Sequence, residues 1–123
     1  MTNFISCVRF KVKQDSYDAF MEKVKEFPLP AGALQHTVVK TGDYSFCTFI
    51  LWQQESDLVN ARPTLIAFLD TCRNLLEELS PELGVTDPVS GPIIHQISWL
   101  FFPLKNKGQN HERIIKTSSR NKR

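Results

Sequence analysis

Hydrophobic and polar residues alternate along residues 4–13, and this period of two predicts a β-strand. One face of the strand carries Phe4, Ser6, Val8, Phe10 and Val12, and the other carries Ile5, Cys7, Arg9 and Lys11. A second strand is predicted at residues 34–40 and a third at residues 44–52, joined by a turn at residues 41–43 into a hairpin. Large apolar residues occupy both faces of the third strand, so both faces must be covered.

Apolar residues at helical spacing predict two helices. The first begins at Asp15 or Ser16, either of which can cap its N-terminus, and runs to about Phe27. A short helical turn follows at residues 55–61, and Pro63 then opens a longer helix that ends near Leu79. A loop rich in turn-forming residues leads to a fourth strand, which is predicted at residues 93–102.

The resulting order of elements is strand, helix, strand, strand, helix, strand, which is the ferredoxin-like βαββαβ arrangement of the α+β class. It predicts a four-stranded antiparallel sheet with both helices on one face. The other face would expose large apolar side chains, which is unusual for a monomer, and a second copy of the sheet would cover it. We therefore expect a homodimer of one domain, residues 1–104. The alternative is that the last strand and the tail fold back over the sheet within one chain.

Charge separates this domain from a tail at residues 105–123. The chain has 123 residues and a net charge of +2. Seven of its 15 basic residues but one of its 13 acidic residues lie in the tail, which carries +6, so the other 104 residues carry −4. A body of that charge lacks the basic face typical of nucleic-acid binding. The composition of the tail is typical of a disordered end, although its charge could also contact RNA or an anionic surface.

Few familiar catalytic patterns occur. Three widely spaced cysteines, Cys7, Cys47 and Cys72, indicate reduced thiols rather than disulfides or a zinc site. No apolar run approaches the roughly 18 to 20 residues that cross a bilayer, and the N-terminus lacks the pattern of a signal peptide. We therefore expect a cytoplasmic protein that does not contact membranes. No phosphate-binding loop, serine-hydrolase elbow or metal-spaced cluster is present, so neither a cofactor nor a metal is predicted.

Three stretches carry a resemblance to a known family: residues 4–12, the hairpin from Lys40 to Trp52, and the helix that Arg62 and Pro63 open. They resemble the antibiotic-biosynthesis-monooxygenase-like family, whose members form dimeric α+β barrels, and the loop at residues 83–92 is similar as well. The likeness covers roughly residues 3–97. The family includes cofactor-free quinone-forming monooxygenases, haem-degrading enzymes, small-molecule isomerases and members with no assigned activity.

The resemblance implies a small-molecule site between the sheet and the helices. Trp52 matches an aromatic residue that often faces this cavity and holds a flat phenolic ring, although packing in the core would explain it equally. Many members carry a histidine in the helical segment after the third strand. Residues 55–64 contain none, and Arg62 stands near the expected place, which counts against haem degradation. Arg62 could bind a phenolate or carboxylate oxygen, or it could be a surface charge.

Histidine supplies the candidate general base, because imidazole titrates near neutral pH. His36 shares one side of its strand with Leu34 and Val38, so its alternative role is a structural histidine in the dimer interface. His95, in the predicted fourth strand, is a further candidate.

The predicted catalytic residues are His36, Trp52 and Arg62. With them we expect a cofactor-independent monooxygenase-like protein that acts on a phenolic or quinol small molecule. The alternative is a non-catalytic small-molecule-binding or stress-response module of the same fold.

Overall fold

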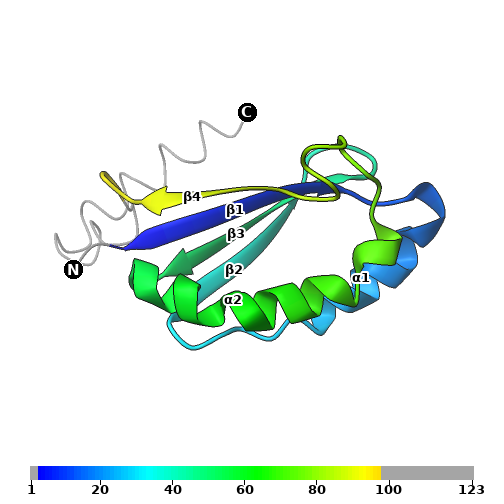
Figure 1. Cartoon of the computed structure of the whole chain (residues 1–123). Coiled ribbons are helices and arrows are strands. Elements are labelled where there is room, and N and C mark those ends of the chain that lie inside the picture. The colour runs from blue at the N-terminus through cyan, green and yellow to red at the C-terminus, as the bar shows by residue number, and fades with distance from the viewer. Residues whose placement is uncertain (1–2, 98–123) are drawn as a thin grey trace, which may run out of the picture. The chain divides into compact units, whose positions relative to one another are not determined.

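The computed structural model describes residues 3–97, whose four strands form one antiparallel sheet in the order β2-β3-β1-β4. The elements in chain order are β1 (Phe4–Lys11), α1 (Tyr17–Lys25), β2 (Ala33–Lys40), β3 (Ser45–Trp52), α2 (Glu55–Asp70) and β4 (Asp87–Pro92), with 3-10 turns at Gln14–Ser16 and Arg73–Leu75. Both helices lie on the same side of the sheet (Figure 1). The predicted ferredoxin-like α+β fold is therefore confirmed.

The chain divides into two units, Met1–Ile93 and Ile94–Arg123, and the sheet and both helices belong to the first. Residues 94–97 are the described part of the second unit. The predicted tail at residues 105–123 lies outside the described residues, so its predicted disorder stays a prediction. Neither helix of residues 3–97 is long and apolar enough to cross a membrane.

The register of the central strands defines two faces of the sheet. Residues that oppose each other in antiparallel strands place their side chains on the same face. In β1 and β3 these pairs are Phe4 with Trp52, Ser6 with Ile50, Val8 with Thr48 and Phe10 with Phe46. We call this the inner face, because its aromatic residues pack with residues of the helices. The outer face carries Ile5, Cys7, Cys47, Phe49 and Leu51, as the predicted alternation requires.

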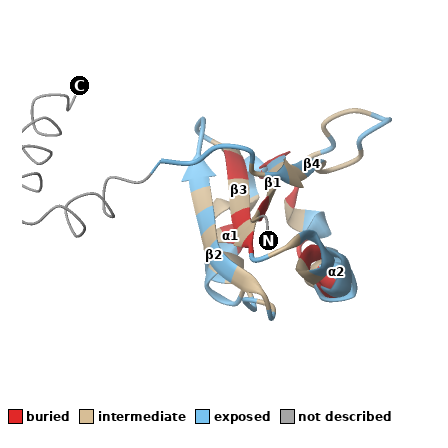
Figure 2. Ribbon diagram, turned by 90° about the vertical axis from the view of Figure 1, so that its left-hand side faces the viewer, coloured by how far each residue is buried: buried red, intermediate tan, exposed pale blue. Residues whose placement is uncertain are grey.

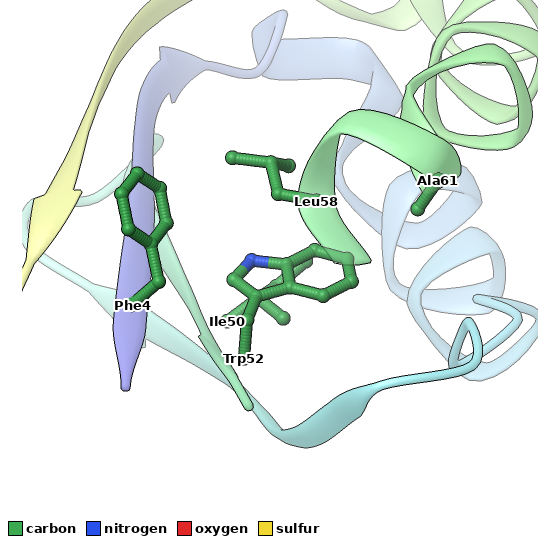
Figure 3. Packing of buried hydrophobic residues seen from close by; sticks show 5 residues of the cluster. All are labelled: Phe4, Ile50, Trp52, Leu58 and Ala61. Atoms are coloured by element: carbon green, nitrogen blue, oxygen red, sulfur yellow. The ribbon is translucent and has the colours of Figure 1, made fainter. Parts of the chain in front are cut away.

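The core lies on the inner face and forms two separate clusters. One cluster lies where β1 begins and β3 ends, and it contains Phe4, Ile50, Trp52, Leu58 and Ala61 (Figure 3). The other gathers at the opposite end of the same strands, and contains Phe10, Val12, Phe20, Phe46 and Leu76. Figure 2 shows that buried residues concentrate on the two central strands and on the side of α2 toward the sheet.

The helix after β3 differs from the prediction in both its start and its end. The helical turn at residues 55–61 and the helix expected from Pro63 are one continuous helix, α2, with Pro63 inside it. This helix stops at Asp70 rather than near Leu79. Leu76 instead forms a β-bridge with Val12, and the backbone N–H of Glu77 donates to the carbonyl of Lys11 at 2.8 Å. Pairing with the end of β1 has therefore overridden the helical spacing of the leucines.

The fourth strand also differs from the prediction, which placed it at residues 93–102. β4 is Asp87–Pro92, within the stretch expected to be a loop, and it pairs with β1 from Phe4↔Pro92 to Arg9↔Asp87. Residues 93–97 contain no strand, and residues 98–102 lie outside the described part of the chain. β4 is an edge strand, where two prolines are tolerated because the unpaired side needs no N–H donors.

Candidate functional site

A cavity of about 620 Å³ lies between the two core clusters and is lined by the inner face of the sheet and by both helices. Its volume falls within the range of roughly 300 to 1,000 Å³ that is typical of small-molecule sites. Most of its wall is apolar and includes Val24 and Phe27 near α1, Ile50 of β3 and Leu65 of α2. The cavity can therefore hold an apolar molecule of two or three rings.

Short hydroxyl side chains on the inner face leave room for this cavity. Ser6 lies between Phe4 and Val8 on the inner face of β1, and Thr48 lies between Phe46 and Ile50 on that of β3. Both line the cavity. Neither residue was predicted to line a cavity, although the sequence carries a signal for both. A short polar residue interrupts an otherwise large, apolar row at the middle of both central strands.

His36 of β2 lines the cavity, as a candidate base must. It pairs with Ile50, which places it on the inner face of the sheet and not on the outer face where a sheet-to-sheet interface would form. Its ring stacks on Phe27, with ring centroids 4.1 Å apart and planes 26° apart. Partial burial lowers the pKa of His36 below its ordinary value of 6.5, because the charged imidazolium is poorly solvated there. The neutral imidazole, which can accept a proton, is therefore favoured.

Two cationic side chains also line the cavity, Arg62 from α2 and Lys23 from α1. Arg62 has no ion pair with any other described residue, while Lys23 Nζ lies 3.5 Å from Glu26 Oε1. No aspartate or glutamate of residues 3–97 is among the cavity-lining residues. The lining thus has a positive charge, which suits a ligand that carries an anionic oxygen.

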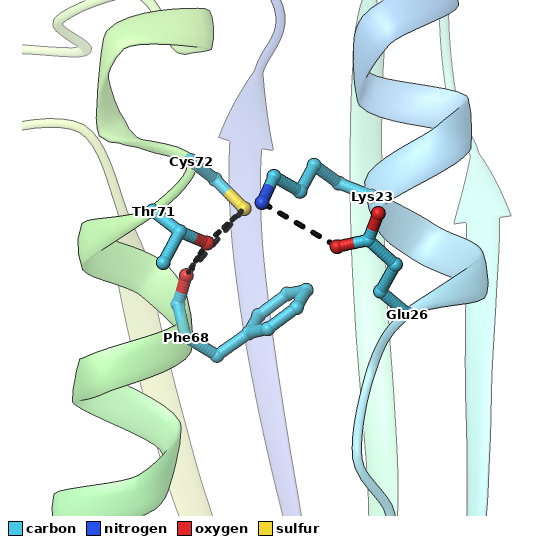
Figure 4. A network of polar contacts seen from close by, with 5 residues as sticks. All are labelled: Lys23, Glu26, Phe68, Thr71 and Cys72. Atoms are coloured by element: carbon cyan, nitrogen blue, oxygen red, sulfur yellow. Dashed lines mark hydrogen bonds and ion pairs between the residues drawn. The ribbon is translucent and has the colours of Figure 1, made fainter.

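Lys23 approaches the cavity opposite the end of α2. Figure 4 shows its ammonium group pointing toward the sulfur of Cys72, and both residues line the cavity. The Cys72 thiol lies 3.6 Å from the carbonyl oxygen of Phe68 and 3.7 Å from Thr71 Oγ1. These contacts orient Cys72 within the helix end.

Two roles were open for Trp52, a cavity wall or packing in the core, and its surroundings are those of a core residue. It has 0% exposure, packs against Phe4, Leu58 and Ala61, and is not among the cavity-lining residues (Figure 3). Its position opposite Phe4, at the end of both strands, puts the indole in the core cluster rather than at the centre of the inner face. Its one polar contact reaches the cavity indirectly, since Nε1 donates a hydrogen bond to Ser6 Oγ at 3.0 Å.

The structure therefore brings His36 and Arg62 together on one cavity and places Trp52 behind it. His95 lies after β4, in no strand, because the fourth strand ends at Pro92. Among residues 3–97, no group of three His, Cys, Asp or Glu side chains is arranged to hold a metal ion.

Comparison with known proteins gives matches at the level of structure. No protein-family model matches the chain, and no curated protein sequence matches it. A variant of SnoaB, a cofactor-independent oxygenase from Streptomyces nogalater, is 14% identical, with a TM-score of 0.58 over 79% of this chain and 98% of that one. A Nitrosomonas europaea protein provisionally assigned as an antibiotic biosynthesis monooxygenase is 16% identical, with a TM-score of 0.61 over 79% and 95% of the two chains.

A third similar structure is described as a dimeric ferredoxin-like protein from an uncultured marine organism. It is 9% identical to this chain, with a TM-score of 0.61 over 80% of this chain and 93% of that one. At these identities the likeness concerns the fold. The chain thus has the ferredoxin-like fold of the antibiotic-biosynthesis-monooxygenase-like proteins, as the sequence resemblance predicted.

Proposed function

We propose that the cavity binds a phenolic or quinol molecule of two or three rings and that the protein oxidises it with molecular oxygen. The observation that supports this proposal is that His36 and Arg62 line the same apolar cavity of about 620 Å³. His36 can act as a neutral base there, and Arg62 supplies a positive charge. The fold shared with SnoaB, a cofactor-independent oxygenase, supports the same reaction type.

The proposed chemistry starts with transfer of the phenolic proton to the imidazole of His36. The phenolate, held by the positive charge of Arg62 and Lys23, is then electron-rich enough to give an electron to oxygen. Recombination at the ring carbon para to the hydroxyl, followed by loss of water, gives a quinone. One oxygen atom enters the ring as a carbonyl, the other leaves in water, and 1-naphthol would give 1,4-naphthoquinone.

Oxygen uptake and quinone formation with 1-naphthol test the proposal. We expect His36→Gln to lower the rate about 100-fold or more, since general bases contribute roughly 10²- to 10⁴-fold. Arg62→Gln should mainly raise KM. Thr37→Val, a change on the outer face of the same strand, is the matched control and should keep the wild-type rate. Unchanged rates in His36→Gln would refute the role of His36. Ligand binding without oxygen uptake in the wild type would favour the non-catalytic binding module.

We also propose that two chains pair through the outer faces of their sheets. That face presents Ile5, Phe49 and Leu51 only partly buried, and Val39 is 38% exposed. Complete burial of an exposed side chain of this size contributes roughly 1.5 to 3 kcal/mol. Covering these partly buried side chains contributes less for each one, and an isologous contact gains it twice. A similar structure is described as dimeric, which supports this arrangement. Sedimentation at micromolar concentration should give about twice the 14.1 kDa mass of one chain.

A cytoplasmic location fits the cysteines of this chain, and we propose it on that basis. Cys7, Cys47 and Cys72 are all free, and two of them are buried, as expected in a reducing compartment. Cell fractionation with a thiol-alkylation assay would test this. Recovery of the native protein with oxidised cysteines in an extracytoplasmic fraction would contradict it.

A further inference from the structure

The indole of Trp52 restricts the directions in which the hydroxyl group of Ser6 can point its proton. The indole N–H of Trp52 is fully buried and donates to Ser6 Oγ at 3.0 Å. An indole nitrogen can only donate, whereas a serine hydroxyl can accept and also donate one hydrogen bond. Ser6 is therefore the acceptor in this pair, and its own proton must point elsewhere.

The proton of Ser6 has no acceptor among the described residues. The side-chain hydrogen bonds of residues 3–97 include Ser6 only as the acceptor for Trp52. Ser6 lies on β1 at the centre of the inner face, opposite Ile50 on one side and Ser90 on the other, and it lines the cavity. The hydroxyl therefore offers a donor to whatever occupies the cavity.

The positive charge of the cavity indicates which kind of ligand atom would accept the hydrogen bond from Ser6. Lys23 and Arg62 line the same space, and no carboxylate of the described residues does. A hydroxyl that donates to an anionic oxygen makes a shorter and stronger hydrogen bond than one that donates to a neutral oxygen. The two cations and the hydroxyl of Ser6 thus all favour an anionic oxygen of the ligand.

We propose that Ser6 determines ligand specificity by donating a hydrogen bond to the ionised oxygen of a flat aromatic ligand, with Trp52 as the positioning residue that orients it. This inference rests on the proposed function in placing a phenolic ligand in the cavity, and adds that the ligand is bound as its anion. In this arrangement Trp52, a buried core residue, orients Ser6, and Ser6 recognises the ionised oxygen of the ligand in the cavity.

Binding of 4-nitro-1-naphthol tests the inference, because this two-ring phenol absorbs differently when it is ionised. The neutral control probe is 1-nitronaphthalene, which lacks the hydroxyl. We expect the wild type to bind nitronaphthol more tightly than nitronaphthalene, and to show the anion spectrum at a pH where the free probe is mostly protonated. Ser6→Ala should weaken nitronaphthol binding about 10- to 100-fold, the range for a hydrogen bond to a charged group. Nitronaphthalene binding should change by less than about 3-fold.

Three further variants separate this role from a structural one. Thr37→Val removes a hydroxyl from the outer face of β2, away from the cavity, and it should leave nitronaphthol binding within about 3-fold of the wild type. Trp52→Phe removes the donor that orients Ser6 and should reduce the preference for the anion while sparing nitronaphthalene binding. If Ser6→Ala does not fold, Ser6→Cys carries the same expectation, because a thiol can accept from the indole but donates weakly.

The outcomes distinguish this inference from the proposed reaction. Equal binding of nitronaphthol by the wild type and Ser6→Ala overturns the inference and leaves the oxidation untouched. Loss of the anion preference in Ser6→Ala, in a wild type that consumes no oxygen with 1-naphthol, supports the inference and refutes the oxidation. Failure of the wild type to bind either probe overturns both.

Discussion

The two faces of this sheet are built from the same strands but are suited to different partners. On the inner face, large aromatic residues at both ends of β1 and β3 pack under the helices, and Ser6 and Thr48 in the middle leave a cavity. On the outer face, Phe49 and Leu51 are partly buried apolar residues that no described helix covers. The short side chains of the inner face leave a space for a small molecule, whereas the large apolar side chains of the outer face offer a surface for a protein.

The largest expected effect is the loss of Trp52, which is central to one inner-face cluster. Trp52→Ala should lower the free energy of unfolding by about 3 to 5 kcal/mol, because it removes a fully buried side chain and leaves a void. Urea denaturation measures this. A loss below about 1 kcal/mol would show that the inner-face cluster does not stabilise the fold as its packing implies.

The next effect concerns the outer face. Phe49→Lys should convert the proposed dimer to a monomer of 14.1 kDa, because the new ammonium group would be desolvated in an apolar interface. The monomer should stay folded, since Phe49 lies on the face away from the helices. Light scattering and circular dichroism together measure both properties. A folded variant that keeps the mass of a dimer would place the interface elsewhere.

A smaller effect is expected from the protonation of His36. Because burial lowers the pKa of His36 in the folded protein, protons bind more readily to the unfolded chain. The free energy of unfolding should therefore decrease as the pH falls below about 6.5, until His36 is protonated in the folded state as well. His36→Gln should flatten this part of the pH profile. An identical slope in the variant would assign the effect to other groups.

The smallest effect is expected from an ion pair at the outer face. Arg9 Nη2 lies 2.6 Å from Asp87 Oδ2 and joins β1 to β4, but the Arg9 side chain is 72% exposed. Asp87→Asn should therefore cost less than about 1 kcal/mol in thermal or urea unfolding. A larger loss would mean that this pair is shielded from water, as it would be if the dimer interface extended to β4.

The sequence predicted the fold because side chains of the central strands alternate between the two faces of the sheet. The alternation in residues 4–12 and 46–52 assigns every side chain of β1 and β3 to the correct face, and register follows from it. The fourth strand was missed because β4 contains Pro88, Gly91 and Pro92, which are typical of loops, and its pairing with β1 is a non-local contact. The end of α2 was missed for the same reason, since Leu76 pairs with Val12.

The candidate site was only partly predictable. His36 and Arg62 could be named from their chemistry, and the structure places both on the cavity. For Trp52 the sequence left the cavity wall and the core equally open, because aromatic size does not distinguish the two, and the residue packs in the core. The role inferred for Ser6 depends on its hydrogen bond with Trp52, 46 residues away in the chain, which no local pattern reveals.

The separation of the two faces is tested most directly by methyl NMR during titration with 4-nitro-1-naphthol. Each central strand, and β2 beside them, carries a matched pair of methyl-bearing residues: Val8 and Ile5 on β1, Ile50 and Leu51 on β3, and Val38 and Val39 on β2. The cavity-lining members are Val8, Ile50 and Val38, and we expect their resonances to shift while those of their outer-face partners stay in place. Shifts of Ile5, Leu51 and Val39 without shifts of the inner three would contradict a ligand site between the sheet and the helices.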